Sequence, residues 1–278
     1  MNRLPLLRPA RSIGAAAHAV RERARANGDQ HGRVLGSFRH GHYVRFGTTT
    51  FAIGQECIHP GPLHLLHTGP SPALRIDSPI TMSADRLWSR RVEINLKGAA
   101  LWNPLQLGRE DLLFSLRVLT QICQPVPPPD LDVEWQAVEV ASREEDLTSL
   151  RTLLEGRGPG LTPVGDDVLA GFLFLYAISR PDDRQVRVFS QMTATSDLSR
   201  DFLYWAGRGH SIEPVYRLMR QASVGHEDAA EQTAAIIRGI GASSGVALLA
   251  GIGLAAAALQ REKELRASLP LDVKPARS

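Results

Sequence analysis

The sequence predicts an α+β protein, with an antiparallel β-rich N-terminal part followed by a mainly α-helical C-terminal part. Two observations carry this prediction. Short runs rich in β-branched and aromatic residues, separated by turns that contain Gly or Pro, fill the chain up to about residue 100. After residue 102 the apolar residues recur at helical spacing instead. Because the strand-like runs do not alternate with helices, a parallel doubly wound sheet is not expected.

The composition is that of an ordinary globular protein. The chain has 278 residues, of which 43% are hydrophobic and 22% charged, and a formal net charge of +3. This is enough chain for one large domain or two modest ones. The two cysteines, Cys57 and Cys123, have no motif spacing and favour a reducing cytoplasm over a disulfide framework. The longest apolar run, residues 246–259, is shorter than the ~20 residues that span a bilayer. No signal-peptide pattern opens the chain, so we expect a soluble cytoplasmic protein without membrane contact.

We expect four segments along the chain: an N-terminal helix in residues 1–29, a β-rich domain in 30–104, a helical domain in 105–264 and a tail in 265–278. Residues 1–25 of the first segment hold six arginines against one acidic residue, Glu22, and these arginines fit one polar face of a helix. No series of aromatic residues accompanies them to stack bases, so nucleic-acid binding is not the expected function. A nucleic-acid-binding regulator that uses this basic segment is kept as an alternative.

Short strands at close spacing predict an antiparallel sheet or a small barrel in the β-rich domain. The strands are expected at residues 31–38, 42–46, 48–54, 62–67, 73–77 and 90–96. Six of the nine histidines also fall here: His31, His40, His42, His59, His64 and His67. Their spacing matches no zinc motif with Cys or Glu, so we expect surface or partly buried histidines, with a metal centre as the alternative.

Apolar periodicity predicts a series of helices in the C-terminal part. The expected helices are 109–123, 142–156, 165–179, 197–209, 212–223, 226–241 and 245–263. In the second of them Ser142 stands as the N-cap, Glu145 follows three residues later and Gly156 marks the stop. The helix at 165–179 is apolar nearly all round and is expected to be buried at the centre of the domain.

The stretch GRGPGLTPVGDD, residues 156–167, contains four glycines and two prolines directly before two adjacent aspartates. Gly158, Gly160 and Gly165 can adopt positive φ or allow close approach of a ligand, while the prolines keep the loop stiff. A helix then begins at about Asp166, and its free N-terminal amides suit an anion.

Two adjacent aspartates oppose an anion at this place unless a cation lies between them. Mg²⁺ held by Asp166 and Asp167 together with substrate oxygens would reconcile the two features. The alternative is that both aspartates only cap the helix and complement its dipole.

A second small-residue turn, GIGASSG at 239–245, also precedes a buried helix. GDDVLAG (165–171) and GVALLAG (245–251) share their glycines and the Leu-Ala-Gly ending. Seven residues are too few to establish a duplication, but they indicate two helices packed side by side with both N-terminal turns at one end. A third polar turn, TATSDLS at 193–199, could lie beside these two turns, with Thr195 and Ser199 facing the same ligand, or could merely cap the next helix. Close helix packing without any ligand is the alternative throughout.

GRGPGLTPVGDDVLAG closely resembles the signature of the oxamate carbamoyltransferase subunit family (AllH-like), long catalogued as a domain of unknown function. Residues 156–167 match its Gly-x-Gly-Pro-Gly-Leu-Thr-Pro-x-Gly-Asp-Asp core without a gap. TATSDLSRDFLYWAGRG is similar to the Thr-x-x-x-Ser helix of the family, and IGASSGVALLAG (240–251) to its Gly-x-Ser-Ser-Gly element. The resemblance extends over about residues 30–260. One departure is Ala247, where many members have Asp.

The resemblance implies a subunit of a bacterial complex that interconverts oxalurate plus phosphate with oxamate plus carbamoyl phosphate in allantoin catabolism. It also implies partner subunits, one of them similar to succinyl-CoA synthetase. Asp166 and Asp167 are then the candidate catalytic residues and Mg²⁺ ligands. The candidate ligand-binding residues are Gly158, Gly160, Thr162, Gly165, Thr195, Ser199, Ser243, Ser244 and Gly245. The competing hypothesis is a non-catalytic scaffold or regulatory subunit whose glycine loop is structural.

Overall fold

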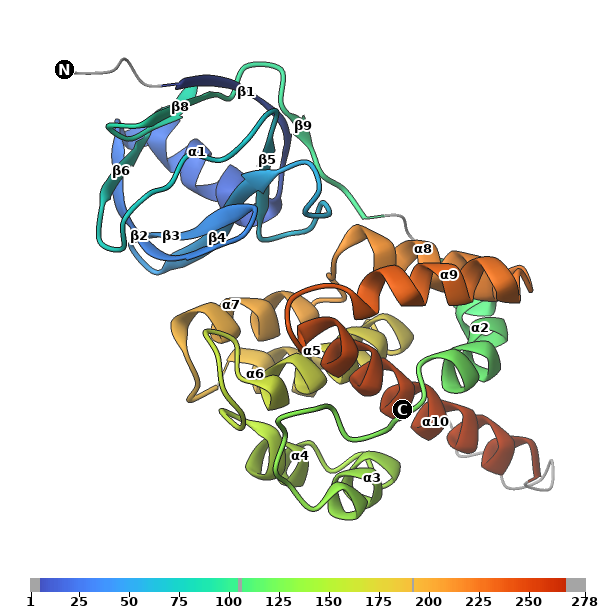
Figure 1. The fold of residues 1–278 in the computed structure, drawn as a ribbon. Coiled ribbons are helices and arrows are strands. Elements are labelled where there is room, and N and C mark those ends of the chain that lie inside the picture. The colour runs from blue at the N-terminus through green and yellow to red at the C-terminus, as the bar shows by residue number, and fades with distance from the viewer. Residues whose placement is uncertain (1–5, 105–106, 192, 269–278) are drawn as a thin grey trace. The chain divides into compact units, whose positions relative to one another are not determined.

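The computed structural model describes residues 6–104, 107–191 and 193–268. The chain divides into two compact units, the first rich in strands and the second helical (Figure 1). The first unit comprises residues 1–105 together with 210–213, and the second comprises 106–209 and 214–278. The predicted α+β class is therefore confirmed, with β structure first and helices after it.

The first unit is a β-barrel, and its described residues include the helix α1 (Ala15–Asn27). Its strands in the described part of the chain are β1 (Leu6–Ile13), β2 (Gln30–Phe38), β3 (Gly41–Phe46), β4 (Thr49–Gln55), β5 (His64–His67), β6 (Pro79–Met82), β7 (Arg86–Trp88), β8 (Val92–Asn95) and β9 (Ala100–Leu101). They follow the order β5-β4-β3-β2-β6-β7-β8-β1-β9, and a further pairing between β5 and β1 closes the barrel. The helix α1 buries Ala17 and Val20 completely, which fills the core that closure creates.

The strand pairing is mixed rather than wholly antiparallel. Most neighbours run antiparallel, as β2 and β3 do with Phe38 opposite Gly41. However, β1 is parallel to both β8 and β9, and β4 is parallel to β5. Parallel neighbours need a crossover connection instead of a tight hairpin. Local hairpin signals in the sequence could not reveal these pairings, because the partners are not joined by short turns.

The helix predicted in residues 1–29 begins only at Ala15, because residues 6–13 form strand β1. Pro9 is poorly suited to a helix interior, and the extended backbone at Gly14 precedes the first helical turn. Strand β1 finds its hydrogen-bond partners in β5 and β8, which are far away in the sequence. Arg8 and Arg11 therefore lie on a strand and not on the polar face of a helix.

The strand predicted at 73–77 is wrong. Residues 71–75 have no regular structure, and Asp77 has a positive φ of 61°. The neighbouring strands β6 and β7 were not predicted, because runs of four and three residues carry too little periodicity.

The second unit is helical (Figure 1). Its described helices are α2 (Arg109–Ile122), α3 (Trp135–Arg143), α4 (Leu147–Leu154), α5 (Val164–Ser179), α6 (Arg184–Gln191), α7 (Asp197–Ala206), α8 (Glu213–Ser223), α9 (Glu227–Arg238) and α10 (Ser244–Ser268). As predicted, α5 is buried on nearly all sides, and α10 packs along it. The short amphipathic helix α6 was not predicted.

The helix predicted at 142–156 is two helices, α3 and α4. Glu145 interrupts it, with a left-handed φ of 57° that helices do not tolerate. Ser142 is consequently not an N-cap, and its hydroxyl donates to the Leu254 carbonyl over 3.2 Å. Asp146 caps α4 instead, accepting from the Thr148 and Ser149 amides.

Helix α10 is longer than the apolar run that predicted it. It continues to Ser268, so residues 265–268 of the predicted tail are helical, while 269–278 lie outside the described residues. Ser244–Leu265 is long and apolar enough to cross a membrane by composition alone. However, 67% of this window is buried inside the protein, as in the core helix of a soluble protein.

Candidate functional site

The loop between α4 and α5 combines positive φ angles with close backbone contacts. Gly156, Gly158 and Gly160 have φ values of 69°, 91° and 110°. Gly156 ends α4 as predicted, in the left-handed conformation typical of helix C-termini. Gly165 serves a different purpose, because a Cβ there would lie 1.9 Å from the Leu154 carbonyl oxygen. Its lack of a side chain lets α5 start directly against the end of α4.

Asp166 holds this loop in place. Its Oδ1 accepts from the Gly156 amide over 2.8 Å, and its Oδ2 accepts from the Thr195 hydroxyl over 2.5 Å. The residue is only 2% exposed. Both carboxylate oxygens therefore have protein donors, and Asp166 links the loop to the turn at 193–199.

The turn at 193–199 is fastened to the loop by a second bond. The Ser196 hydroxyl donates to the Leu161 carbonyl over 2.9 Å, and Ser196 also caps α7 by accepting from the Ser199 amide. The structure thus brings Thr195 to the loop, as the sequence suggested it could. Ser199 is 1% exposed, and its hydroxyl has no hydrogen-bond partner among the described residues.

Asp167 has a different environment from its neighbour. Part of the residue stays accessible, but Oδ2 is buried and has no hydrogen-bond partner in the described part of the chain. Burial raises the pKa of Asp167 to about 8; hydrogen bonds with the Ser244 and Thr162 hydroxyls oppose the rise, and the Asp166 charge adds to it. Asp167 is therefore mainly a neutral carboxylic acid at pH 7.

The Ser244–Asp167 interaction places the first turn of α10 beside the first turn of α5. Glycines make this approach possible further along the two helices. A Cβ on Gly171 would lie 2.1 Å from the Leu248 oxygen, and one on Gly251 would lie 1.9 Å from the Val168 oxygen. The predicted side-by-side packing of the two helices through small residues is confirmed.

The turn at 239–245 reproduces the geometry of the 156–165 loop. The Gly165 amide donates to the Arg157 carbonyl over 2.9 Å, and the Gly245 amide donates to the Ile240 carbonyl over 3.0 Å. A Cβ on Gly245 would lie 1.7 Å from the Ile237 oxygen, matching the contact of Gly165 with α4. The positive φ of Gly158 likewise has its counterpart in Gly241, at 67°.

These equivalent contacts relate two helix–turn–helix segments, α4–α5 and α9–α10. In this correspondence Ala247 stands where the first segment has Asp167, and the second turn is three residues shorter. Ser243 lies in that turn, and its carbonyl accepts from the Ala247 amide over 3.0 Å. At the end of the helices where the two turns lie, the second segment therefore contributes hydroxyl groups but no carboxylate.

Metal ligands are sparse around the loop. Within the described ranges, no three His, Cys, Asp or Glu side chains come together as a metal site. Asp166 and Asp167 are adjacent, but both oxygens of Asp166 already accept hydrogen bonds. Of the two aspartates, Asp167 is therefore the one whose carboxyl group could contact a ligand, through Oδ2.

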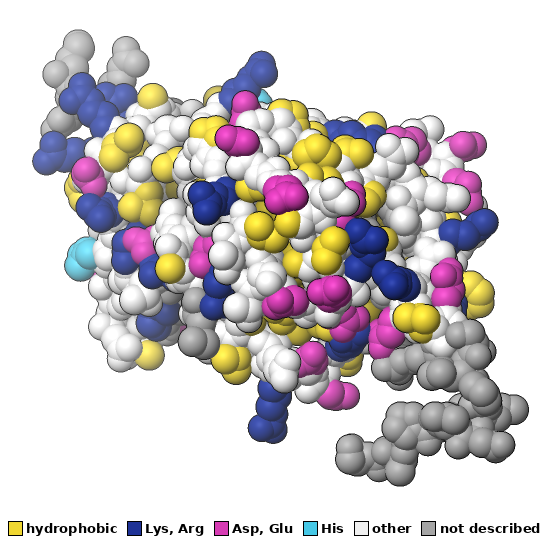
Figure 2. Space-filling model, turned by 90° about the horizontal axis from the view of Figure 1, so that it is seen from below, with side chains coloured by type: hydrophobic (Ala, Val, Ile, Leu, Met, Phe, Trp, Pro, Cys, Tyr) yellow, Lys and Arg dark blue, Asp and Glu magenta, His cyan; other side chains and the backbone are white. Residues whose placement is uncertain are grey.

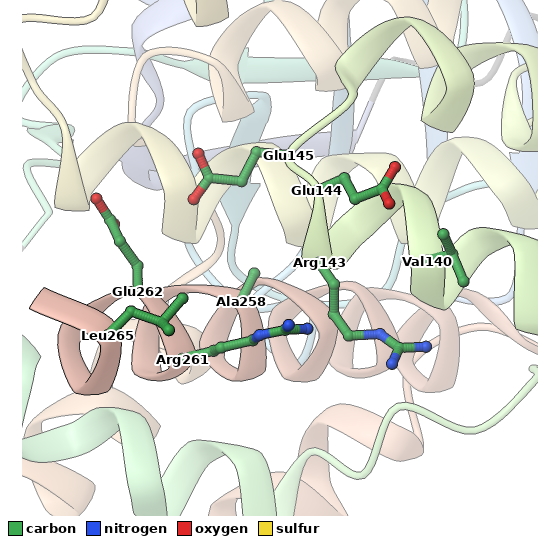
Figure 3. A pocket seen from close by; sticks show the side chains of 8 residues that line it. All are labelled: Val140, Arg143, Glu144, Glu145, Ala258, Arg261, Glu262 and Leu265. Atoms are coloured by element: carbon green, nitrogen blue, oxygen red, sulfur yellow. The ribbon is translucent and has the colours of Figure 1, made fainter. Parts of the chain in front are cut away.

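A separate cavity of about 470 Å³ lies between α3 and the C-terminal half of α10 (Figure 3). It is lined by Val140, Arg143, Glu144, Glu145, Ala258, Arg261, Glu262 and Leu265. Three carboxylates line the cavity, those of Glu144, Glu145 and Glu262. Arg180 forms ion pairs with two of them, with Glu145 over 2.6 Å and with Glu262 over 2.7 Å. None of its lining residues belongs to the 156–167 loop.

The N-terminal arginines are dispersed among partners of the barrel. Arg11 pairs with Glu56, Arg21 donates to the Ala84 carbonyl, and Arg23 donates to Thr49. Figure 2 shows acidic and basic side chains mixed over the face it presents. The structure does not support the single basic helix face on which the nucleic-acid alternative rested.

Comparison with known proteins identifies a family for part of the chain. Residues 154–256 match the model of the family described as oxamate carbamoyltransferase subunit AllH. This range contains the 156–167 loop, the turn at 193–199 and the turn at 239–245, so the resemblance drawn from these motifs is confirmed over it. The family is that of a carbamoyltransferase subunit. No curated protein and no solved structure matches the chain.

Proposed function

We propose that the protein is a subunit of an oxamate-type carbamoyltransferase, and that its ligand, carrying a carboxylate or phosphate, binds where the three turns meet. The family match supports the reaction class. The observation that carries the site is the buried Oδ2 of Asp167, which has no hydrogen-bond partner among the described residues. Leaving such a group unsatisfied costs about 1–3 kcal/mol, which a bound ligand would relieve.

The protonation state of Asp167 resolves the conflict between a carboxyl group and an anionic ligand. A neutral acid donates a hydrogen bond to a phosphate or carboxylate oxygen instead of repelling it. In this proposal Asp167 contacts the ligand directly, whereas Asp166 is a positioning residue that holds the loop. The amides near Gly158 and Gly160, with Thr162, face the ligand on one side, and Ser243, Ser244 and Gly245 form the opposite wall.

The expected ligands are oxamate, carbamoyl phosphate or a related carbamoyl compound, and partner subunits complete the transferase, one of them similar to succinyl-CoA synthetase. Mg²⁺ remains part of the proposal only as an ion shared with the ligand. The protein would offer it chiefly Asp167, so phosphate or carboxylate oxygens would have to supply other ligands. Mg²⁺ would also have to displace the Asp167 proton, which makes its binding stronger at higher pH.

A thermal-shift titration of the purified chain tests the site. Oxamate, carbamoyl phosphate and phosphate are each added with and without Mg²⁺. At a hundredfold excess over Kd, a true ligand stabilises the fold by about 2.7 kcal/mol. Asp167→Asn should abolish the shift while the protein stays folded, and Asp182→Asn, at an exposed aspartate, is the matched control.

Asp166→Ala separates positioning from direct binding. This variant loses two buried hydrogen bonds, so it should lower the free energy of unfolding by about 1–3 kcal/mol as well as weaken ligand binding. Asp167→Asn should weaken binding without such a loss.

The second candidate is a non-catalytic scaffold or regulatory subunit. It is favoured by the finding that Gly165, Gly171, Gly245 and Gly251 are all required by close helix packing alone. If none of the ligands shifts the unfolding temperature of the wild-type chain, alone or with its partner subunits, the scaffold function is the better account.

A further inference from the structure

A serine–histidine pair lies in the barrel, outside the proposed ligand site. His67 Nε2 is 3.0 Å from the Ser71 hydroxyl, and His67 Nδ1 is 3.1 Å from the Thr68 carbonyl oxygen. A carbonyl only accepts hydrogen bonds, so Nδ1 carries the proton and Nε2 is the acceptor. The Ser71 hydroxyl has two acceptors within reach, the His40 carbonyl oxygen at 3.4 Å and His67 Nε2 at 3.0 Å. The shorter contact is with His67, so Ser71 stands to His67 as a nucleophile to its general base.

His67 is suited to be that base. The residue is 1% exposed, and burial lowers the pKa of its imidazole below the ordinary value. Among the charged groups around it, Arg8 and His42 lower this pKa further, whereas Glu56 and the bond to the Thr68 carbonyl raise it. The imidazole is thus neutral and able to accept a proton at pH 7.

The segment that carries Ser71 is held in one conformation. Ser71 stands between Pro70 and Pro72, which restrict the backbone on both sides. His42 Nε2 donates to the Pro72 carbonyl over 2.8 Å and fastens the segment to β3. Ser71 itself is partly exposed.

Closure of the barrel brings a cation to the same place. In the β1–β5 pairing Ala10 lies opposite His67, and Arg8 is two residues away on the same face of β1. A Cβ added to Gly69 would lie 3.3 Å from the guanidinium carbon of Arg8, so the guanidinium packs against the segment between His67 and Ser71. Arg8 Nε is buried and has no hydrogen-bond partner in the described part of the chain. It is a donor available for a developing negative charge.

We propose that Ser71 and His67 form an acyl-transfer centre that acts on small activated esters or carbamates. Ser71 Oγ attacks the carbonyl carbon and its proton passes to His67 Nε2, while Arg8 faces the oxyanion. The bond to the leaving oxygen then breaks, and the leaving group takes the proton from Nε2. Water then attacks the acyl-serine ester and passes a proton to His67 Nε2. The bond between the acyl carbon and Ser71 Oγ breaks, Nε2 returns the proton to Oγ, and the acid is released. This centre is independent of the ligand site at Asp167.

Active-site labelling of the full-length chain tests the proposal. A fluorophosphonate probe is followed by intact mass and peptide mapping, and p-nitrophenyl acetate hydrolysis is followed by absorbance. We expect one label, on Ser71, and its loss in Ser71→Ala. His67→Gln should slow labelling by about 10²-fold or more, the usual contribution of a general base.

Ser37→Ala is the matched control, because Ser37 makes a similar 2.9 Å contact with His42 and should not be needed. Asp167→Asn should also label at the wild-type rate, which keeps this test separate from that of the ligand site. If His67→Gln does not fold, the labelling rate of Arg8→Gln, which should be lower than that of the wild type, and the pH dependence of the wild-type labelling rate are measured instead. With the His67 pKa below its ordinary value of 6.5, the labelling rate should be near its plateau by that pH. A wild-type chain that takes no label, or takes it on another residue, overturns the proposal.

Discussion

Two adjacent aspartates with the same sequence context have different chemistry in the folded protein. The sequence presents Asp166 and Asp167 as an equivalent pair, because a helix N-terminus favours acidic residues at either position. What separates them is tertiary: Asp166 meets the Gly156 amide and Thr195 hydroxyl, and Asp167 meets Ser244 from α10. Sequence reasoning could find the pair but not their division of roles, because that depends on distant partners such as Thr195, which is 29 residues from Asp166.

The raised pKa of Asp167 makes stability depend on pH. The folded-state value is about 8 and the ordinary value is 3.8, so the folded chain binds a proton more tightly than the unfolded chain. This contribution is fully present below about pH 4 and is lost as the pH rises to about 8, by at most ~1.4 kcal/mol per pH unit. Asp167→Asn cannot lose the proton, so it should gain stability relative to wild type between pH 5 and 8.

Urea unfolding at pH 5, 6.5 and 8 measures this difference. Asp182→Asn should follow the wild-type pH dependence, because this aspartate is exposed. Parallel curves for wild type and Asp167→Asn would show that Asp167 is not protonated in the folded protein.

At the scale of elements, the sequence predicted helices correctly where the apolar periodicity extends over many residues. The predicted helix boundaries were wrong where the backbone angle of a single residue sets them. The buried helix α5 follows from its sequence alone, whereas the break at Glu145 depends on a left-handed conformation that its residue type does not announce. Strand β1 escaped prediction for another reason. Its partners are β5 and β8, so its stability comes from barrel closure and not from local preference.

The crossing of α5 and α10 should be sensitive to one added methyl group. Gly251→Ala places a Cβ 1.9 Å from the Val168 oxygen and 2.8 Å from the Phe172 nitrogen, so the backbones must separate. Overpacking of this kind costs about 1–3 kcal/mol of unfolding free energy. Because the same crossing brings Ser244 to Asp167, ligand binding should weaken as well.

Gly239→Ala is the control for this prediction. A Cβ there has no neighbour nearer than 3.4 Å, and its φ of −78° suits alanine. Denaturant midpoints for both variants decide the matter, and a Gly251→Ala protein as stable as Gly239→Ala would contradict the packing described here.

At the scale of the whole molecule, the chain joins a barrel to a helical unit built around two similar helix–turn–helix segments. Apart from residues 210–213, the family match falls on the helical unit, and the barrel carries the Ser71–His67 pair. The sequence indicated both parts, but the barrel's closure rests on β1, which was expected to be helical. Of the N-terminal arginines, Arg8 and Arg11 lie in this strand, whereas Arg21, Arg23 and Arg25 lie on α1.

Deletion of residues 1–13 should therefore open the barrel. It removes the strand that pairs with β5, β8 and β9, and leaves their backbone groups without partners. We expect loss of Ser71 labelling and increased aggregation, because an unpaired strand edge recruits other chains. Arg11→Ala, which removes only an exposed ion pair with Glu56, should change stability by less than about 1 kcal/mol. Circular dichroism and light scattering follow the two variants. A deletion that leaves the strand signal and Ser71 reactivity intact would show that β1 is dispensable, and the position of Arg8 beside His67 would then lose its structural basis.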